Sequence, residues 1–238
     1  MISDAINKIV ELAKPIEFTV DGRQYSSKAL RPITEPVPDK LVISTLTGLK
    51  DYYDRNPDGL DLSTLIFRIS SHDKVSLLGP LFGSFERRKV YLEAQFISED
   101  FPYGSFIDPE SFIIKLQAIF QQDDTTAKLL AIVGNIKDEK VMNVGDDGIT
   151  QQVVARAGIA KVENVNLPNP ITLTPYRTFL EADQPLSQFV FRMRSGAAEK
   201  SVSCALFEAD GGRWKLDAIQ NIKKWLHLNV SADIQVLA

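Results

Sequence analysis

The stretch CALFEADGGRWKLDAIQNIKKWL, residues 204–226, decides how the C-terminal part of this chain folds. It begins with an apolar run, continues through acids and a pair of glycines, and ends in apolar residues spaced three or four positions apart. That spacing is typical of an amphipathic helix, which we expect over Arg213–Leu226. The buried face of this helix is predicted to contain Trp214, Ala218, Ile222 and Trp225. The stretch therefore predicts a strand, a turn and a helix in direct succession.

The Gly-Gly pair at the centre of this stretch has two interpretations. Glycines before a helix let backbone amides approach a phosphate, which the positive end of the helix dipole favours. However, Glu208 and Asp210 place negative charge where that anion would lie, and the run has neither a G-x-G-x-x-G nor a Walker motif. We therefore favour a structural turn, in which Asp210 turns or caps the chain and Gly211 or Gly212 adopts a positive φ.

The N-terminal segment has a helix pattern followed by turn signals. Apolar residues at helical spacing predict a helix over Ile2–Ala13, which Pro15 terminates. One face of this helix collects Ile2, Ile6, Ile9, Val10 and Ala13. The pair Asp21-Gly22 between two alternating runs indicates a β-hairpin. Three prolines within Arg31–Lys40 then predict an extended connector, because proline fixes φ and donates no hydrogen bond.

The middle of the chain alternates helices and strands without a regular βαβ order. Helices are expected over Thr45–Arg55, from an N-cap at Asp108 with Pro109 in the first turn, and over Thr125–Ile136. Strand patterns occur in LSTLIFRIS, KVSLLGPL and FERRKVYLEAQF, and again in ITQQVVARAGIA, NPITLTPYRTF, QFVFRMRSG and SVSCALFEA. This order predicts an α+β fold with a mostly antiparallel sheet, interspersed helices and an amphipathic C-terminal helix, formed by a single domain over residues 1–238.

Composition narrows the class of protein. The chain has 238 residues, 44% apolar and 24% charged, as in ordinary globular proteins. No apolar run approaches the roughly 20 residues that span a bilayer, and the N-terminal segment does not have the order of a secretion signal, so we expect a cytoplasmic protein without membrane contact. The net charge of −4 argues against a surface that binds duplex DNA throughout, but it permits a local basic groove.

Few residues suit catalysis or metal binding. The single Cys204 is expected in the core, and His72 reads as a turn residue between two strands. With only two histidines, no G-x-S-x-G motif and no calcium-loop pattern in the acidic clusters SEDF, QQDD and GDDG, we expect no catalytic residues, no metal site and no cofactor.

Basic and aromatic residues are interleaved in three segments, YRTF, FVFRMR and FERRKVY. On a strand, Phe189 and Phe191 share one face while Arg192 and Arg194 share the other. Such a surface can follow phosphates while aromatic rings stack on bases, although an amphipathic sheet with solvated arginines has the same pattern. The candidate ligand-binding residues are Arg87, Arg88, Tyr176, Arg177, Arg192 and Arg194.

The segments LTPYRTFLEADQP, FVFRMR, ALFEADGGRWKLDAIQNIKKWL and KVSLLGPL resemble the YfdQ-like family of phage and prophage proteins. The resemblance covers roughly Leu41–Leu226. It implies a phage-encoded viral protein that acts inside the host cell, often encoded beside recombination and single-strand-binding genes. The family carries no established reaction, so it implies no catalytic residues.

Together these features predict a non-catalytic, self-associating protein that acts on single-stranded nucleic acid or nucleotides during infection. One variant is a host-defence antagonist that sequesters a nucleotide signal such as a cyclic nucleotide, which requires only a pocket of arginine and aromatic residues. Two alternatives stay open at this point. One is a metal-dependent enzyme that uses scattered carboxylates such as Glu208 and Asp210, and the other is a protein–protein inhibitor of a host protein.

Overall fold

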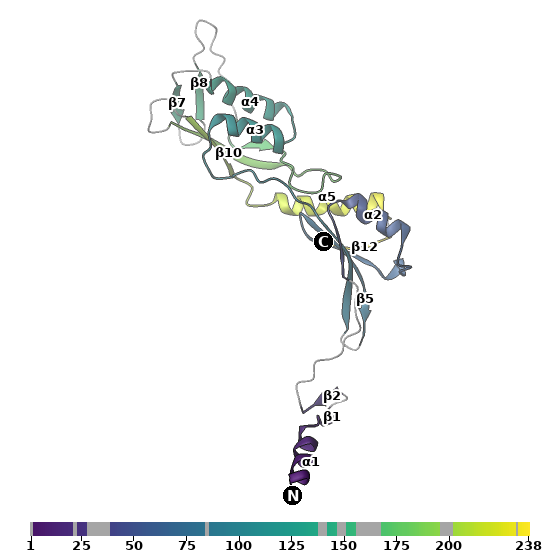
Figure 1. Ribbon diagram of the computed structural model, residues 1–238. Helices are drawn as coiled ribbons and strands as arrows, with labels where there is room; N and C mark the ends of the chain where they lie inside the picture. The colour runs from purple at the N-terminus through teal and green to yellow at the C-terminus, as the bar shows by residue number, and fades with distance from the viewer. Residues whose placement is uncertain are drawn as a thin grey trace. The chain divides into compact units, whose positions relative to one another are not determined.

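The computed structural model describes residues 2–20, 23–27, 39–83, 86–137, 142–146, 151–155, 168–195, 202–231 and 233–238. The chain divides into two compact units, Met1–Pro38 and Asp39–Ala238, which are described separately (Figure 1). A single domain over residues 1–238 therefore stays a prediction. Residues 31–38 of the predicted proline-rich connector lie outside the described residues.

The described residues of the first unit form one helix and one hairpin. Helix α1 (Ile2–Ala13) is followed by β1 (Glu17–Val20) and β2 (Arg23–Ser26), which pair antiparallel. The predicted helix and hairpin are thus confirmed, and the Asp21-Gly22 turn itself lies outside the described residues. No side chain of α1 is buried.

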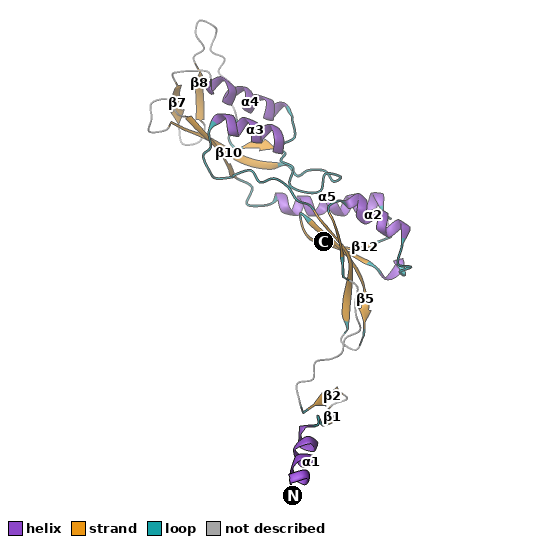
Figure 2. Ribbon diagram, in the orientation of Figure 1, coloured by secondary structure: helices purple, strands orange, loops and turns teal. Residues whose placement is uncertain are grey.

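A five-stranded sheet organises one part of the second unit, with the order β12-β4-β5-β6-β3. The central pairs β4–β5 and β5–β6 are antiparallel, while β12–β4 and β3–β6 are parallel. Its strands are β3 (Leu41–Ile43), β4 (Ile66–Ser71), β5 (Lys74–Phe82), β6 (Arg87–Gln95) and β12 (Gln235–Leu237). Helices α2 (Leu46–Arg55) and α5 (Trp214–Asn229) and the short 3₁₀ helix η1 (Leu62–Thr64) complete this part (Figure 2). Side chains of the sheet, α2 and α5 form one hydrophobic cluster, the β5 core, which includes Leu46, Leu49, Phe67, Leu77, Phe179, Ile222 and Leu226.

A three-stranded antiparallel sheet organises the other part, with the order β11-β10-β9. Its strands are β9 (Ile171–Leu173), β10 (Ser187–Ser195) and β11 (Val202–Glu208), and it packs against α3 (Pro109–Ile119) and α4 (Asp124–Lys137). A separate hairpin joins β7 (Met142–Asp146) to β8 (Gln151–Ala155). The second hydrophobic cluster, the β10 core, includes Phe101, Phe112, Leu116, Ile119, Phe120, Phe189 and Leu206.

Local caps explain where the helices begin. The Asp108 carboxylate accepts a hydrogen bond from the Ser111 amide at 2.9 Å, and Pro109 occupies the first turn of α3. At the start of α2, the Thr45 hydroxyl accepts a hydrogen bond of 3.1 Å from the Gly48 amide. Each cap satisfies one of the backbone amides that the first turn leaves unpaired. The predicted α+β class, the largely antiparallel pairing and the C-terminal helix are confirmed.

The Gly-Gly stretch forms the structural turn that the sequence favours. Gly211 and Gly212 have φ values of +63° and +82°, and the Gly212 amide donates to Asp210 Oδ1 at 2.9 Å. The predicted buried face of α5 is right for Trp214, Ala218 and Ile222. Trp225 is partly buried and packs against the β5 core, while the fully buried residue at this end of the face is Leu226, which the sequence analysis did not name. A strict spacing of four residues selects Leu226.

Candidate functional site

A pocket lies where the two cores of the second unit meet. In its wall, Phe101 and Ile119 belong to the β10 core, whereas Trp214 begins α5, whose later turns lie in the β5 core. The cavity holds about 270 Å³. Its lining consists of His72, Ser98, Glu99, Asp100, Phe101, Tyr103, Ile119, Tyr176, Arg177, Glu208, Trp214 and Lys215.

A loop between β9 and β10 carries Tyr176 and Arg177 into this pocket. The Tyr176 amide donates to the Ile119 carbonyl at 2.8 Å, which fixes the loop to the end of α3. Gln184 organises the rest, because its Oε1 atom accepts from the Arg177 amide at 2.9 Å and its Nε2 atom donates to the Phe179 carbonyl at 3.0 Å. The loop backbone is therefore held on both sides of Arg177.

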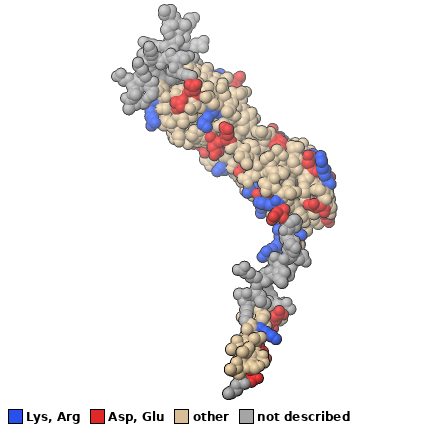
Figure 3. Space-filling view, viewed as in Figure 1, with Lys and Arg blue, Asp and Glu red and all other residues tan. Residues whose placement is uncertain are grey.

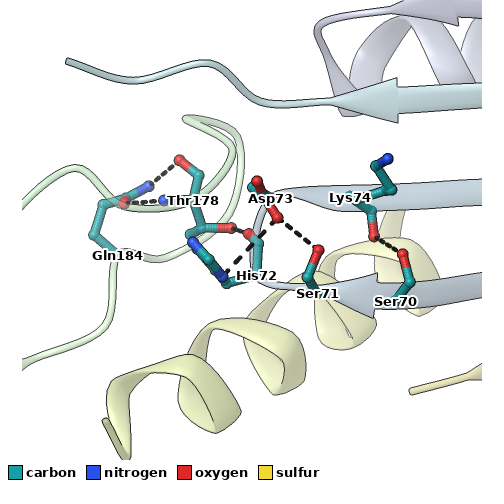
Figure 4. A network of polar contacts seen from close by, with 7 residues as sticks. All are labelled: Ser70, Ser71, His72, Asp73, Lys74, Thr178 and Gln184. Carbon is teal, nitrogen blue, oxygen red and sulfur yellow. Dashed lines mark hydrogen bonds and ion pairs between the residues drawn. The ribbon is translucent and has the colours of Figure 1, made fainter. Parts of the chain in front are cut away.

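The same loop is tied to the β4–β5 turn. In Figure 4 the Thr178 hydroxyl points to the carbonyl oxygen of His72, to which it donates a hydrogen bond. Within that turn, the Ser71 hydroxyl donates to Asp73 Oδ1 at 2.6 Å. This network sets His72 and Arg177 against the same pocket, although they come from distant parts of the sequence.

The Arg177 guanidinium is enclosed by aromatic rings. Only 7% of the residue is exposed, and its Cζ atom lies 4.3 Å from the centre of the Trp214 ring and 4.4 Å from that of Tyr103. The Phe189 ring lies 5.2 Å away and stacks on Tyr103 with ring centres 5.3 Å apart. Cation–π contacts of this kind stabilise a cation that has left water.

The Arg177 guanidinium has one carboxylate partner. Its Nη2 atom lies 2.7 Å from Glu208 Oε1, where the two side chains form an ion pair. The buried Trp214 Nε1 atom has no hydrogen-bond acceptor among the described residues.

Titration of the neighbouring groups follows from burial. Burial lowers the pKa of His72, and the positive charges of Lys215 and Arg177 lower it further. The negative charge of Asp73 acts in the opposite direction and raises the pKa of His72. The neutral imidazole lies edge-on to Trp214 with ring centres 4.7 Å apart. Burial also raises the pKa of Tyr103. Both rings are therefore uncharged at neutral pH, so the charges of the pocket come from its carboxylates, Arg177 and Lys215.

The pocket is mixed in charge rather than basic. Glu99, Asp100 and Glu208 contribute carboxylates, while Arg177 and Lys215 contribute cations. On the face of the molecule in Figure 3, Lys and Arg side chains are likewise interspersed with Asp and Glu, and neither sign forms a continuous patch. A ligand that combines an acceptor with hydrogen-bond donors suits this lining better than a bare polyanion does.

A second hollow adjoins the first. It has a volume of about 580 Å³ and shares Ser98, Glu99, Ile119 and Tyr176 with the pocket at Arg177. Two exposed apolar side chains, Ile97 and Leu180, also line it. Tyr176, whose ring is half-buried, thus borders both hollows.

The structure separates the six candidate binding residues into three places. Tyr176 and Arg177 line the pocket. Arg192 and Arg194 project from β10 on the face opposite the buried Phe189, Phe191 and Met193, so the predicted alternation is confirmed.

Arg194 lies over the Phe106 ring, with its Cζ atom 4.3 Å from the ring centre. Arg87 and Arg88 begin β6, where the Arg88 side chain donates to the Gly79 carbonyl at 3.0 Å. None of these four arginines lines the pocket at Arg177.

The residues considered for metal chemistry have structural contacts. Among the described residues, no group of three or more His, Cys, Asp and Glu side chains could hold a metal ion. Glu208 forms an ion pair with Arg177, and the Asp210 carboxylate accepts a hydrogen bond from the Gly212 amide. Cys204 is buried in the β10 core, as predicted.

Of the residues that line the pocket, sequence analysis identified only Tyr176 and Arg177 as binding residues. Tyr103 and Trp214 each lie beside a glycine turn, in FPYG and GGRW, and His72 and Lys215 lie next to Asp73 and Trp214. Aromatic residues next to glycine turns are a usable signal, because such turns hold the side chain at the end of an element. The signal does not indicate which turns meet.

Comparison with known proteins yields no relative. No family model, no curated protein and no solved structure matches this chain. The resemblance to the YfdQ-like family therefore stays a prediction. Among the described helices, none combines the length and the apolar character needed to cross a membrane.

Proposed function

We propose that this protein is a phage-encoded, self-associating binding protein of the host cytoplasm that holds a nucleotide unit in the pocket at Arg177 and performs no chemistry on it. The observation that carries the proposal is the buried Arg177 guanidinium in the wall of the pocket, which lies against the rings of Trp214 and Tyr103 and beside the partly exposed Glu208. A phosphate oxygen or a base carbonyl is the acceptor that this fork of donors fits.

The rest of the lining favours a nucleotide over a simple anion. Glu99 and Asp100 can accept hydrogen bonds from the amino group of a base, and Tyr176 offers a half-buried ring for stacking. Lys215 is exposed on α5, where it can meet a phosphate. A volume of about 270 Å³ suits one nucleotide unit, because ligand pockets of drug-sized molecules begin near that size.

The ligand is either a free nucleotide or one unit of a single strand. The adjoining hollow beside Tyr176 would receive the next base of a strand or the second half of a cyclic dinucleotide. A protein that sequesters a nucleotide signal from a host defence needs this kind of pocket and no catalytic group. We propose that the protein binds this ligand without catalysing a reaction on it.

The test is a binding titration by calorimetry at low and moderate salt. Its probes are mononucleotides, cyclic mono- and dinucleotides, and short single-stranded DNA. The informative variants are Arg177→Gln, Lys215→Ala and the double variant Arg192→Gln with Arg194→Gln, and Lys223→Ala on the same helix as Lys215 is the matched control. We expect Arg177→Gln to weaken binding about 10- to 100-fold, because a hydrogen bond to a charged group contributes that much. Lys215→Ala should weaken it less, and neither the β10 double variant nor Lys223→Ala should affect it.

Two results would contradict the proposal. If the parent binds none of the probes, the nucleotide proposal is wrong and a protein–protein inhibitor becomes the better explanation. If the double variant at Arg192 and Arg194 loses binding while Lys215→Ala and Arg177→Gln keep it, the ligand lies on the outer face of β10. Lys215→Ala keeps the test valid should Arg177→Gln fail to fold, since Lys215 is exposed.

A further inference from the structure

Helix α1 has a broad apolar face that no described residue of its own unit covers. Ile2, Ile6 and Ile9 are 80%, 55% and 66% exposed, and Val10 and Leu12 are exposed as well. No residue of α1 is buried, and the neighbouring hairpin also exposes its stacked pair Phe18 and Tyr25. The described residues of the first unit therefore form no hydrophobic core.

Such a unit is not expected to be stable alone. An isolated helix of 12 residues is at the lower limit of stability in water, and a two-stranded hairpin is marginal for the same reason. The apolar side chains of the helix and the hairpin therefore require burial against another surface, whose nature follows from the residues of α1.

The spacing of the apolar residues fits a helical partner. Ile2, Ile6, Ile9 and Ala13 are separated by four, three and four positions, which is the spacing of the d and a positions of a heptad repeat. A seam with this period packs against other helices of the same period by inserting side chains into holes between four neighbours.

The charges point to copies of the same helix. Asp4, Lys8 and Glu11 lie on the opposite side of α1, where Lys8 and Glu11 form an ion pair at 2.9 Å. The positions that flank the seam hold Ser3, Ala5, Val10 and Leu12. Because these flanks carry no charge, identical helices meet without like-charge repulsion.

The charges also disfavour two other occupants. A partner of opposite charge would find no charge to pair with beside the seam. A membrane surface favours a polar face rich in Lys and Arg, whereas the polar face of α1 carries both signs.

The residue types indicate more than two helices. Isoleucine at both a and d positions favours three- and four-stranded bundles over dimers. The apolar Val10 and Leu12 widen the face beyond a two-helix seam, so each helix can contact neighbours on both sides. A helix of 12 residues is only about 18 Å long, and a bundle buries more of it than a pair does.

We propose that α1 is the self-association element of this protein and that it assembles at least three copies of the chain through the seam of Ile2, Ile6 and Ile9. This inference deepens the self-association in the proposed function and is independent of the ligand pocket.

The experiment is native mass spectrometry of the full chain, with light scattering at several concentrations. The test variant is Ile6→Asp, the matched control is the neighbouring Asn7→Asp on the polar face, and Ile6→Leu is the conservative variant. We expect the parent, Asn7→Asp and Ile6→Leu to have three or more times the monomer mass, and Ile6→Asp to be monomeric. The control introduces the same negative charge one position away, so a general effect of an added charge on the helix would affect both variants.

The possible failures are distinguishable. A monomeric parent overturns both self-association and the role of α1. A parent oligomer that survives Ile6→Asp leaves self-association standing but places the interface elsewhere. A strictly dimeric parent that Ile6→Asp dissociates contradicts the bundle of three or more helices. Nucleotide binding by the monomeric variant would not bear on any of these outcomes.

Discussion

Alanine should have opposite effects at two glycines of this protein, although the chemical change is the same. Gly212 precedes α5 with a φ of +82°, and a Cβ atom added there meets no atom within 4 Å. The cost of Gly212→Ala is therefore that of the left-handed backbone alone, about 1–2 kcal/mol of unfolding free energy. Gly134 lies inside α4, where an added Cβ also meets no atom within 4 Å. Gly134→Ala should stabilise the protein by about 0.5–1 kcal/mol, because alanine is the better helix former.

Thermal denaturation followed by circular dichroism measures both effects. For a chain of this length, 1 kcal/mol corresponds to a change in Tm of about 2–4 °C. The Tm of Gly212→Ala should therefore fall by a few degrees, while that of Gly134→Ala should rise slightly. Nucleotide binding, if the parent shows it, should survive in folded Gly212→Ala protein.

An unchanged or higher Tm for Gly212→Ala would refute the reasoning, because it would mean that this residue does not need a positive φ. A second outcome bears on function. If Gly212→Ala keeps its Tm but loses nucleotide binding, the glycines act on a phosphate and the phosphate-loop interpretation of this turn has to be restored.

Three further changes test packing and electrostatics. Leu226→Ala should lower the unfolding free energy in urea by about 2–5 kcal/mol, while Trp225→Ala should cost less than the roughly 3–5 kcal/mol of a fully buried tryptophan. A hydrogen bond from Lys40 holds the pKa of Glu93 below its ordinary value of 4.5. The stability that ionised Glu93 contributes is therefore fully present above pH 4.5, and it is lost as the pH falls through the lower pKa of the folded state. The Tm difference between the parent and Glu93→Gln should therefore shrink below pH 4.5, and a difference that grows there would contradict this. Burial raises the pKa of Cys204 to about 12, so iodoacetamide should label the thiol only after unfolding, and labelling of the native protein would place Cys204 outside the core.

The helices were predictable because their signals are local. The Asp108 cap and Pro109 start α3 through contacts within one turn, and the apolar spacing of α1 gives its bounds without reference to any other segment. The β1–β2 hairpin is equally local, since an Asp-Gly pair between alternating runs suffices.

The sheet edges were not predictable for the opposite reason. Strands β3 and β12 have three residues each, which is too short to show a period of two. Each pairs in parallel with a strand far away in sequence, β6 and β4 respectively. No turn signal specifies such a pairing, so the mixed edges of a largely antiparallel sheet depend on the packing of the whole unit.

The candidate site was predictable only in part. Tyr176 and Arg177 were identified by the interleaving of basic and aromatic residues, but the same pattern also selected Arg192 and Arg194. Alternation along β10 turns those two away from Phe189, whereas Arg177 lies over the Phe189 ring. Residue pattern alone cannot distinguish an arginine that packs inward from a loop from one that projects from a strand.

The chemistry of Arg177 gives the strongest reason to expect a ligand. Glu208 is 40% exposed, so its ion pair with Arg177 is weakened by solvent and offsets little of the cost of burying a guanidinium. A methionine would fill the space between Trp214 and Tyr103 with no such cost, and replacing buried ion pairs by apolar residues is often neutral or stabilising. The cation–π contacts with Trp214 and Tyr103 offset part of the cost of burying this charge. Under the proposed function, an acceptor on the ligand would give this guanidinium a partner in addition to the partly exposed Glu208.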